Sequence, residues 1–406
     1  SSGEERCSGA TRETCDAYAN CGDNGVFCDS VWSGDACAGV TSTCIEQTKS
    51  NGGIAASCVP PGTIMTCGAT PLPSSPAGNV LAGDADGDGN VDVIVVGSDK
   101  VQAFLRANDG SFSAGPTSAI SWDGLEAMAT GDFDGDGVLD IAALTYDTSS
   151  EDENAQISFA KGTGGGAFSM PVPFGSLNAN ATYGQLFAAD LDGDGSSDLI
   201  IGANLLLAHD AGSTSRSIPW SSECADTTAT GIGDFDGDGH VDVIGALGGN
   251  VCIAFGDGNG SFAAGTQVLS GSYVLTRASD FDGDSHLDIL AVDTSGCLVV
   301  LLGRGDRTFA PPVPSSGSIA LGLGEIFPID MDFDGRADLL FANGITLGIA
   351  LSTGGGAFGA PTYFAPKVSN PGVADLVAAL VTKNPPRVDA IIASADQIES
   401  IAGACR

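Results

Sequence analysis

This 406-residue sequence has few of the side chains that enzymes use for acid–base and nucleophilic chemistry. It contains three histidines, and no Gly-x-Ser-x-Gly, phosphate-binding loop or His-Glu-x-x-His motif. No apolar run reaches about 18 residues, so no membrane-spanning helix is predicted. Basic residues are also scarce, with 15 Lys and Arg against 51 Asp and Glu and a net charge of −36. This charge argues against nucleic acid or an anionic membrane as a partner, and we expect a protein that is not an enzyme.

Aspartate is abundant, and much of it falls in one nine-residue pattern. In residues 132–140 the carboxylates occupy positions 1, 3, 5 and 9, and glycines occupy positions 4 and 6. Carboxylates this close repel one another unless a cation neutralises them, and hard oxygen donors in a flexible loop suit Ca²⁺. The apolar, β-branched residues that follow the pattern predict a strand.

The pattern occurs six times, and the copies are named here loops 1 to 6 in chain order. Their predicted ligands are Asp84, Asp86, Asp88 and Asp92; Asp132, Asp134, Asp136 and Asp140; Asp190, Asp192, Asp194 and Asp198; Asp234, Asp236, Asp238 and Asp242; Asp280, Asp282, Asp284 and Asp288; and Asp330, Asp332, Asp334 and Asp338. Ser285 replaces the second glycine of loop 5, and Phe333 replaces the first glycine of loop 6. We therefore predict about six structural Ca²⁺ ions, which would bring the net charge from −36 to about −24.

The spacing of the loops predicts the fold. Successive first aspartates are 48, 58, 44, 46 and 50 residues apart, and periods of about 40–50 residues are typical of propeller blades. An EF-hand is the alternative, but position 12 is never acidic and the flanks read as strands rather than helices. An acidic turn without metal is the other alternative, and it does not explain six copies of one carboxylate spacing.

A seventh copy has lost its ligands. Val381, Lys383 and Pro385 occupy positions 1, 3 and 5, and only Asp389 at position 9 remains. We therefore predict an all-β fold, a seven-bladed β-propeller over residues 63–406 whose last blade lacks the metal. That blade ends without an outer strand, and residues of about 64–72 resemble the missing strand, so we expect them to close the ring.

Seven of the twelve cysteines lie in residues 1–62, where apolar residues are sparse. We predict a small domain there that disulfides stabilise. Zinc is the competing reading, but this segment has no Cys-x-x-Cys and no histidine. Ring closure predicts a Cys67–Cys405 disulfide, with Cys58–Cys67 as the alternative. One N-terminal cysteine would then bridge to Cys224, Cys252 or Cys297. Twelve cysteines also indicate an oxidising compartment, hence a secreted or surface-displayed protein.

The glycine-rich turns add a specific resemblance. Phe358-Gly359-Ala360-Pro361 matches the signature of FG-GAP repeats, and residues 112–116 are a looser copy. With the aspartate loops, residues 63–406 resemble the calcium-binding propeller of integrin α subunits, and equally bacterial FG-GAP or VCBS repeat proteins and fungal propeller lectins. The resemblance implies that the backbone carbonyl at loop position 7 also binds calcium. These carbonyl donors would be Asn90, Val138, Ser196, His240, His286 and Arg336.

Four aromatic residues are the candidates for a ligand-binding face. Trp122, Tyr183, Trp220 and Tyr273 precede their loops by 7 to 14 residues, and we expect them on the face opposite the calcium loops. There they could stack on a ligand or simply pack between blades. Arg304-Gly305-Asp306 is read as a hairpin turn rather than an adhesion signal. We expect a monomeric adhesion or protein-interaction module, with a glycan-binding lectin as the alternative.

Overall fold

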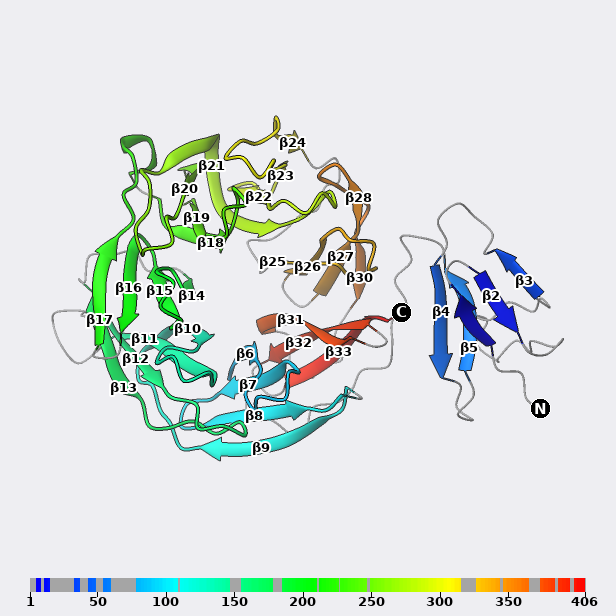
Figure 1. Cartoon of the computed structure of the whole chain (residues 1–406), viewed down its shortest axis with the longest axis horizontal. Helices are drawn as coiled ribbons and strands as arrows, with labels where there is room; N and C mark the ends of the chain where they lie inside the picture. Colours follow the sequence, from blue (N-terminus) through cyan, green and yellow to red (C-terminus); the bar gives the residue numbers. More distant parts are fainter. Residues whose placement is uncertain are drawn as a thin grey trace.

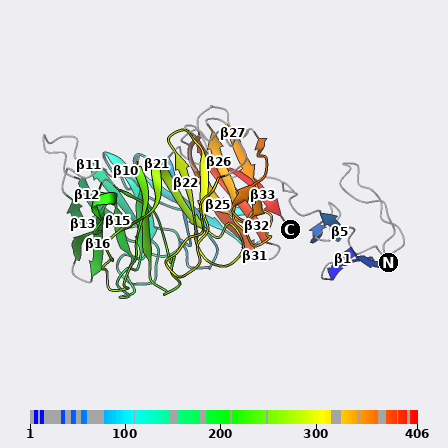
Figure 2. The same cartoon turned by 90° about the horizontal axis from the view of Figure 1, so that it is seen from above.

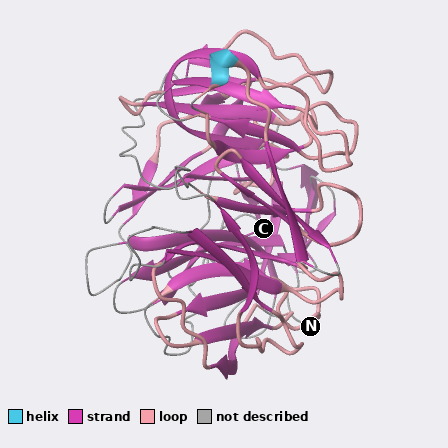
Figure 3. Cartoon of the chain, turned by 90° about the vertical axis from the view of Figure 1, so that its left-hand side faces the viewer, coloured by secondary structure: helices cyan, strands magenta, loops and turns pink. Residues whose placement is uncertain are grey.

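The computed structural model describes residues 78–108, 110–146, 155–177, 185–209, 212–225, 227–246, 249–314, 326–343 and 346–364. Outside these ranges it describes the backbone of strands β1 to β5 and β31 to β33. Almost every described element is a strand, and the one described helical turn is the 3₁₀ turn Ser222–Cys224 (Figure 3). Among the described residues, no helix has the length and apolar character needed to span a membrane.

From β6 onward, the strands form consecutive antiparallel groups, and we name the first six groups blades 1 to 6. Blade 1 contains β6 (Asn79–Gly83), β7 (Asp92–Val96), β8 (Val101–Arg106) and β9 (Phe112–Ser118). Blade 2 contains β10 (Leu125–Gly131), β11 (Asp140–Tyr146), β12 (Ala155–Ala160) and β13 (Val172–Leu177). Blade 3 contains β14 (Leu186–Ala189), β15 (Asp198–Ile201), β16 (Asn204–His209) and β17 (Gly212–Ser217).

Blades 4 and 5 share one long strand. Blade 4 contains β18 (Ala229–Gly233), β19 (Asp242–Gly245), β20 (Gly249–Ala254) and the first half of β21 (Thr266–Ser279). Blade 5 contains the second half of β21, β22 (Asp288–Asp293), β23 (Leu298–Leu301) and β24 (Val313–Pro314). Blade 6 contains β25 (Ile326–Ile329), β26 (Asp338–Asn343), β27 (Thr346–Ala350) and β30 (Thr362–Phe364), with the hairpin β28 (Ser352–Gly354) and β29 (Ala357–Phe358).

The groups are arranged around a common axis. Figure 1 shows them as a ring, with the first strand of each group near the middle and the fourth at the outside. The side view in Figure 2 shows the strands standing next to one another around this ring. First strands of consecutive groups lie in contact, including β6 with β10 and β21 with β25. The predicted all-β propeller architecture is confirmed.

The hydrophobic core lies between neighbouring blades. The second strand of each blade has buried apolar residues on both of its faces, and β7 (Asp-Val-Ile-Val-Val) is buried along its whole length. One cluster joins blades 2 and 3 through Phe133, Leu144, Leu199 and Leu206, and similar clusters join the other pairs of blades 1 to 6. Burial of both strand faces explains why these strands read as continuous apolar runs rather than alternating ones.

The last group of strands contains β31 (Val373–Lys383), β32 (Pro386–Ser394) and β33 (Ile398–Cys405). β31 contacts both β6 and β25, so this group lies between blades 6 and 1. Residues 64–72 lie outside the described residues, and a complete seventh blade therefore stays a prediction. Val381 and Asp389 fall inside β31 and β32, which pair up to Lys383 and Pro386. Paired strands thus occupy most of the positions that the nine-residue loop has in blades 1 to 6.

Five strands precede the ring: β1 (Glu5–Ser8), β2 (Thr11–Thr14), β3 (Ser33–Ala36), β4 (Thr43–Thr48) and β5 (Ile54–Val59). They form two small sheets of their own, β1-β2-β3 and β4-β5. The register of β4 and β5 places Cys44 opposite Cys58. The division into domains 1–62 and 63–406 stays a prediction.

The disulfides of the ring differ in part from the prediction. Cys224 and Cys252 are bonded to each other, with their Cα atoms 6.2 Å apart. The prediction that either of them bridges to the N-terminal segment is therefore wrong, because the 3₁₀ turn brings Cys224 next to β20. Cys297 is exposed and unpaired within the described part of the chain. Cys67 lies outside the described residues, so the Cys67–Cys405 bond is untested.

Candidate metal centre

All six carboxylate loops occupy the same place in the fold. Each loop follows the first strand of its blade, and its position 9 aspartate is the first residue of the second strand. The residue at position 2 is apolar and buried, as Phe133 and Phe281 show, so it anchors the loop in the core between two blades. The loops are therefore built into the blades.

The first aspartate organises the loop backbone. In loop 1, Asp84 accepts N–H hydrogen bonds from Gly87 (2.8 Å) and Gly89 (2.9 Å). Asp88, at position 5, accepts the N–H of Asn90 at 2.8 Å. The bond from position 6 to position 1 and the bond from position 7 to position 5 recur in the other five loops. The bond from position 4 to position 1 recurs in loops 3, 4 and 5. Because the donors are backbone N–H groups, these hydrogen bonds depend on the path of the loop backbone and not on the side chains of the donor residues.

The two loops with a replaced glycine keep this path. Ser285 has a φ of 71° and Phe333 a φ of 58°, values in the left-handed region where the other loops have glycine. The N–H of Ser285 still bonds to Asp280 at 2.8 Å, and the N–H of Gly335 still bonds to Asp330 at 2.9 Å. The left-handed backbone costs free energy at a non-glycine residue, yet loops 5 and 6 keep the hydrogen bonds from positions 6 and 7 that the other loops have.

The position 9 aspartates are fully buried in all six loops. Each accepts two backbone N–H groups, one from loop position 2 and one from the last two residues of the third strand or from the second residue beyond it. In loop 4, Asp242 accepts from Phe235 at 2.8 Å and from Gly256 at 2.9 Å. One side chain thus ties the loop to two strands of its blade.

Burial raises the pKa of these aspartates well above the usual 3.8. Loss of solvation is the largest cause, and it outweighs the two N–H hydrogen bonds, which lower the pKa. The pKa is about 6 for Asp92, Asp140, Asp198 and Asp242 and about 7 for Asp288 and Asp338. The neighbouring loop carboxylates contribute to the same rise by repulsion. A bound cation would favour the ionised form instead.

The carboxylates converge closely enough to share an ion. In loop 1, oxygens of Asp84, Asp86 and Asp92 lie within 4.8 Å of one another. Equivalent groups occur in loop 2 (Asp132, Asp134 and Asp136), loop 3 (Asp190, Asp192 and Asp198) and loop 4 (Asp234, Asp236 and Asp242). Oxygen-only donors on a glycine-turned loop fit Ca²⁺ better than a transition metal.

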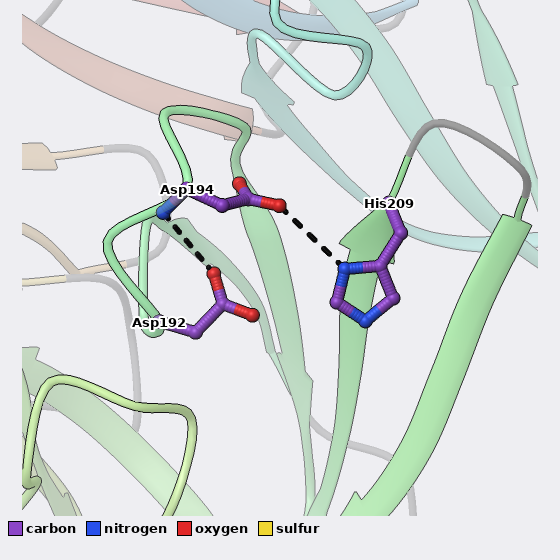
Figure 4. Close-up of side chains that lie close together, drawn as sticks. All are labelled: Asp192, Asp194 and His209. Carbon is purple, nitrogen blue, oxygen red and sulfur yellow. Dashed lines mark hydrogen bonds and ion pairs between the residues drawn. The ribbon is translucent and has the colours of Figure 1, made fainter.

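His209, at the end of β16, is a neighbour of loop 3 that the aspartate pattern does not predict. Its Nδ1 lies 3.5 Å from an oxygen of Asp194, and it forms a possible metal-binding group with Asp192 and Asp194 (Figure 4). The position of His209 in its blade indicates this contact. His209 directly follows Ala208, whose N–H bonds to Asp198 of the same loop.

The loops also contact the following blade. The carbonyl of Ala85 in loop 1 accepts the N–H of Gly166 from blade 2 at 3.0 Å, and that of Leu191 in loop 3 accepts the N–H of Gly260 from blade 4 at 2.9 Å. Two loop pairs bond directly, through Ser197 N–H to Asp132 O (2.6 Å) and Ala337 N–H to Asp280 O (2.7 Å). An ion in a loop would therefore stabilise the contact between blades as well as the blade itself.

The aromatic residues predicted to bind a ligand lie in separate places. Trp122 donates to Ser158 Oγ at 3.1 Å and packs between blades 1 and 2. Trp220 packs between blades 3 and 4, and Tyr273, only 9% exposed, packs between blades 4 and 5. Tyr183 lies outside the described residues. These contacts match the alternative of packing between blades, so ligand stacking has no geometric support and stays a prediction.

A cavity of about 460 Å³ lies among the first strands of blades 2 to 6. Its wall is mostly apolar, with Thr230, Gln185 and Arg277 as polar members. The Arg277 guanidinium donates to Ile326 O (2.9 Å), Thr276 O (3.0 Å) and Gln185 Oε1 (3.3 Å). The arginine thus links three blades across the middle of the ring.

The sequence contains recognisable repeats. The family model of FG-GAP-like repeats matches residues 84–143 and 280–341, which include loops 1, 2, 5 and 6. No curated protein sequence matches the chain.

Several solved structures share the fold. The BP39L lectin from Burkholderia pseudomallei is 18% identical with a TM-score of 0.55, over 82% of this chain and 98% of that one. An Agrocybe aegerita lectin that recognises non-reducing terminal N-acetylglucosamine is 18% identical with a TM-score of 0.54, over 72% and 81%. BBS1N, solved in complex with ARL6DN, is 12% identical with a TM-score of 0.52, over 84% and 97%. At such identities the likeness concerns the fold alone.

Proposed function

Because the chain carries FG-GAP-like repeats on a β-propeller, we propose that it is a secreted or cell-surface calcium-binding module that recognises a protein ligand. Calcium has a structural role in this proposal, and the protein acts as a monomer. The observation that carries the proposal is the shared geometry of six loops, each with a buried position 9 aspartate, together with the converging carboxylates of loops 1 to 4. Without cations, charge repulsion and loss of solvation at the carboxylates of six loops would destabilise the fold.

Two features of the chain support the proposed compartment. The Cys224–Cys252 disulfide and the cysteine-rich N-terminal segment favour an oxidising environment. Extracellular calcium, at about 1 mM, would keep even modest loop sites filled. The position of the loops between blades then makes calcium part of the ring's stability.

The calcium role predicts a large response to chelation. An ion that binds only the folded state stabilises it by about 2.7 kcal/mol at one hundred times its Kd, and several sites contribute together. We expect excess chelator to lower the Tm markedly and added calcium to restore it, as measured by differential scanning calorimetry. Magnesium at the same concentration is the control, because it fits flexible oxygen sites less well. An identical Tm with calcium and with chelator would contradict the proposal.

Glycan recognition is the second candidate function. The BP39L and Agrocybe aegerita structures are lectins, and BBS1N was solved in complex with ARL6DN, so the fold is compatible with more than one class of ligand. Lectin pockets that repeat from blade to blade need similar side chains at equivalent positions. Trp122, Trp220 and Tyr273 are not equivalent to one another in their blades, which favours a protein ligand.

Binding to cells distinguishes the two candidates. The full-length protein, labelled and loaded with calcium, is added to cells that have been treated with protease, with glycosidases or with buffer. Loss of saturable binding after protease alone supports the protein ligand, and loss after glycosidases, with matching signals on a glycan array, supports the lectin. The absence of saturable binding to untreated cells and to the array would contradict both.

A further inference from the structure

Two of the six loops have a basic side chain at the same pair of carboxylates. In loop 2, Lys161 Nζ lies 2.5 Å from Asp134 Oδ2 and 2.9 Å from Asp136 Oδ2. In loop 4, Arg307 Nε lies 2.5 Å from Asp236 Oδ2, and its Nη2 lies 3.5 Å from Asp238 Oδ2. These aspartates occupy positions 3 and 5 of their loops.

The two cations come from different parts of the fold. Lys161 belongs to the same blade as its loop and directly precedes Gly162, which donates to Asp140 of loop 2. The equivalent residue in blade 4 is Phe255, because it precedes Gly256, which donates to Asp242 of loop 4.

Arg307 comes from the next blade and takes the place of the missing lysine. It follows the Arg304-Gly305-Asp306 turn of blade 5, and its guanidinium carbon lies 4.9 Å from the centre of the Phe255 ring. A guanidinium over an aromatic face is a favourable contact. In blade 4, Phe255 occupies the position that Lys161 has in blade 2. Its ring packs against Arg307, which contacts the carboxylates at positions 3 and 5 of loop 4. Two unrelated segments thus place a positive charge at the same two loop positions, 3 and 5.

The contacted oxygens are the ones that a metal ion would need. Asp136 Oδ1 and Asp238 Oδ1 accept backbone N–H groups at 2.9 Å within their loops. The Oδ2 atoms face the lysine or arginine instead. A calcium ion and the side-chain cation would therefore draw on the same Oδ2 atoms, and their positive charges would repel each other.

Loops 1 and 5 have no basic side chain at these carboxylates within the described part of the chain. The residues equivalent to Lys161 in blades 1 and 5 are Leu105 and Leu302, which precede the donors to Asp92 and Asp288. In loop 6, Arg336 from the loop itself contacts the position 5 aspartate, Asp334.

We propose that Lys161 and Arg307 compete with calcium and so set the affinity of loops 2 and 4. These loops then bind calcium more weakly than loops 1 and 5, and they keep their shape better when calcium is removed. The inference rests on the calcium binding proposed above. It assigns loops 2 and 4, which have a basic side chain at positions 3 and 5, to a weaker class and loops 1 and 5, which have none, to a tighter class.

The test counts bound calcium in the full-length protein at buffered free calcium concentrations. Lys161→Met and Arg307→Met each remove one cation and keep most of the aliphatic packing. We expect each variant to tighten one site roughly tenfold, an order of magnitude typical of removing one partly exposed charge next to a divalent ion. In excess chelator each variant should have a lower Tm than the wild type, because the carboxylates lose their counter-ion.

Matched controls separate the local effect from total charge. Lys100→Met removes a lysine from a turn in blade 1, and Arg304→Met removes an arginine that bonds within the same hairpin as Arg307. Both should bind calcium like the wild type. Lys161→Arg, which keeps the charge, should also bind like the wild type.

Three results would overturn the inference. Unchanged calcium binding in both variants, or weaker binding, would show that the cations do not compete with the ion. Equal tightening by the controls would show an effect of total charge alone. If the wild type binds no calcium at any concentration, the proposed calcium role fails as well, which distinguishes the two failures.

Discussion

At the scale of single residues, the position 9 aspartate has the main structural role in each loop. It is fully buried, and its two oxygens receive backbone N–H groups from two segments of one blade. An asparagine of the same shape has only one acceptor atom, and its amide group would face the second N–H donor.

Asp242→Asn is therefore expected to destabilise the calcium-free protein by about 1–3 kcal/mol, the cost of a buried donor without a partner. The measurement is chemical denaturation in excess chelator. Asp238→Asn, in the same loop but partly exposed, should change that free energy by less than about 0.5 kcal/mol. Equal effects of the two substitutions would contradict the role assigned to Asp242.

The raised pKa of these aspartates predicts how stability depends on pH. These groups have a pKa of about 6 to 7 in the folded protein and 3.8 in the unfolded chain. Their contribution to folding is therefore fully present below pH 3.8. That contribution is lost as the pH rises through about 6 to 7. In chelator, the Tm should consequently fall between pH 5 and pH 8.

With saturating calcium the direction should reverse, because ionised carboxylates are needed to bind the ion. Calorimetry at several pH values with calcium or chelator checks both directions. A Tm that rises with pH in chelator would contradict the pKa argument. Asp242→Asn should reduce the slope in chelator.

At the scale of elements, the first strands of the blades are held together by side-chain hydrogen bonds. Thr230 and Thr276 hydroxyls lie 2.5 Å apart between β18 and β21, and Thr130 Oγ1 donates to Ala82 O between β10 and β6. Arg277 extends this pattern from β21 to Ile326 O at β25 and to Gln185 near β14.

Arg277→Met should therefore loosen the middle of the ring. We expect a loss of about 1–3 kcal/mol in the free energy of unfolding, because carbonyl acceptors lose a charged donor. The control is Gln185→Met, which removes only the exposed amide partner and should cost less than about 0.5 kcal/mol. Urea denaturation of both variants in calcium measures the difference, and equal values would argue against a linking role for the arginine.

At the scale of the whole molecule, the ring must close between its last and first groups of strands. β31 contacts β6, so the two ends of the propeller meet. Closure by residues 64–72, with a Cys67–Cys405 disulfide, would complete the last blade and constrain a loop of more than 300 residues.

Peptide mapping without reduction tests this closure. We expect one peptide that joins Cys67 to Cys405 and another that joins Cys224 to Cys252. A peptide that joins Cys58 to Cys67 would contradict closure by a disulfide. The register of β4 and β5 favours a Cys44–Cys58 bond instead, because it places these residues opposite each other.

The sequence alone determined the propeller and the position of its six loops. The pattern of positions 1, 3, 5 and 9 is local in the chain, and it repeats because each blade needs the same turn between its first two strands. Strand type, loop boundaries and the absence of EF-hand helices all follow from residues fewer than ten apart, where backbone geometry and side-chain chemistry act together.

Only the tertiary structure decided which residues from other segments meet these loops. Lys161, His209 and Arg307 are 15 to 71 residues from the aspartates they contact, and the Cys224–Cys252 pair replaced the predicted links to the N-terminal segment. Likewise, the packing of Trp122 and Tyr273 between blades could not be read from their spacing. Such contacts depend on how blades stack around the ring, and stacking is set by the shape of whole sheets rather than by any local run of residues.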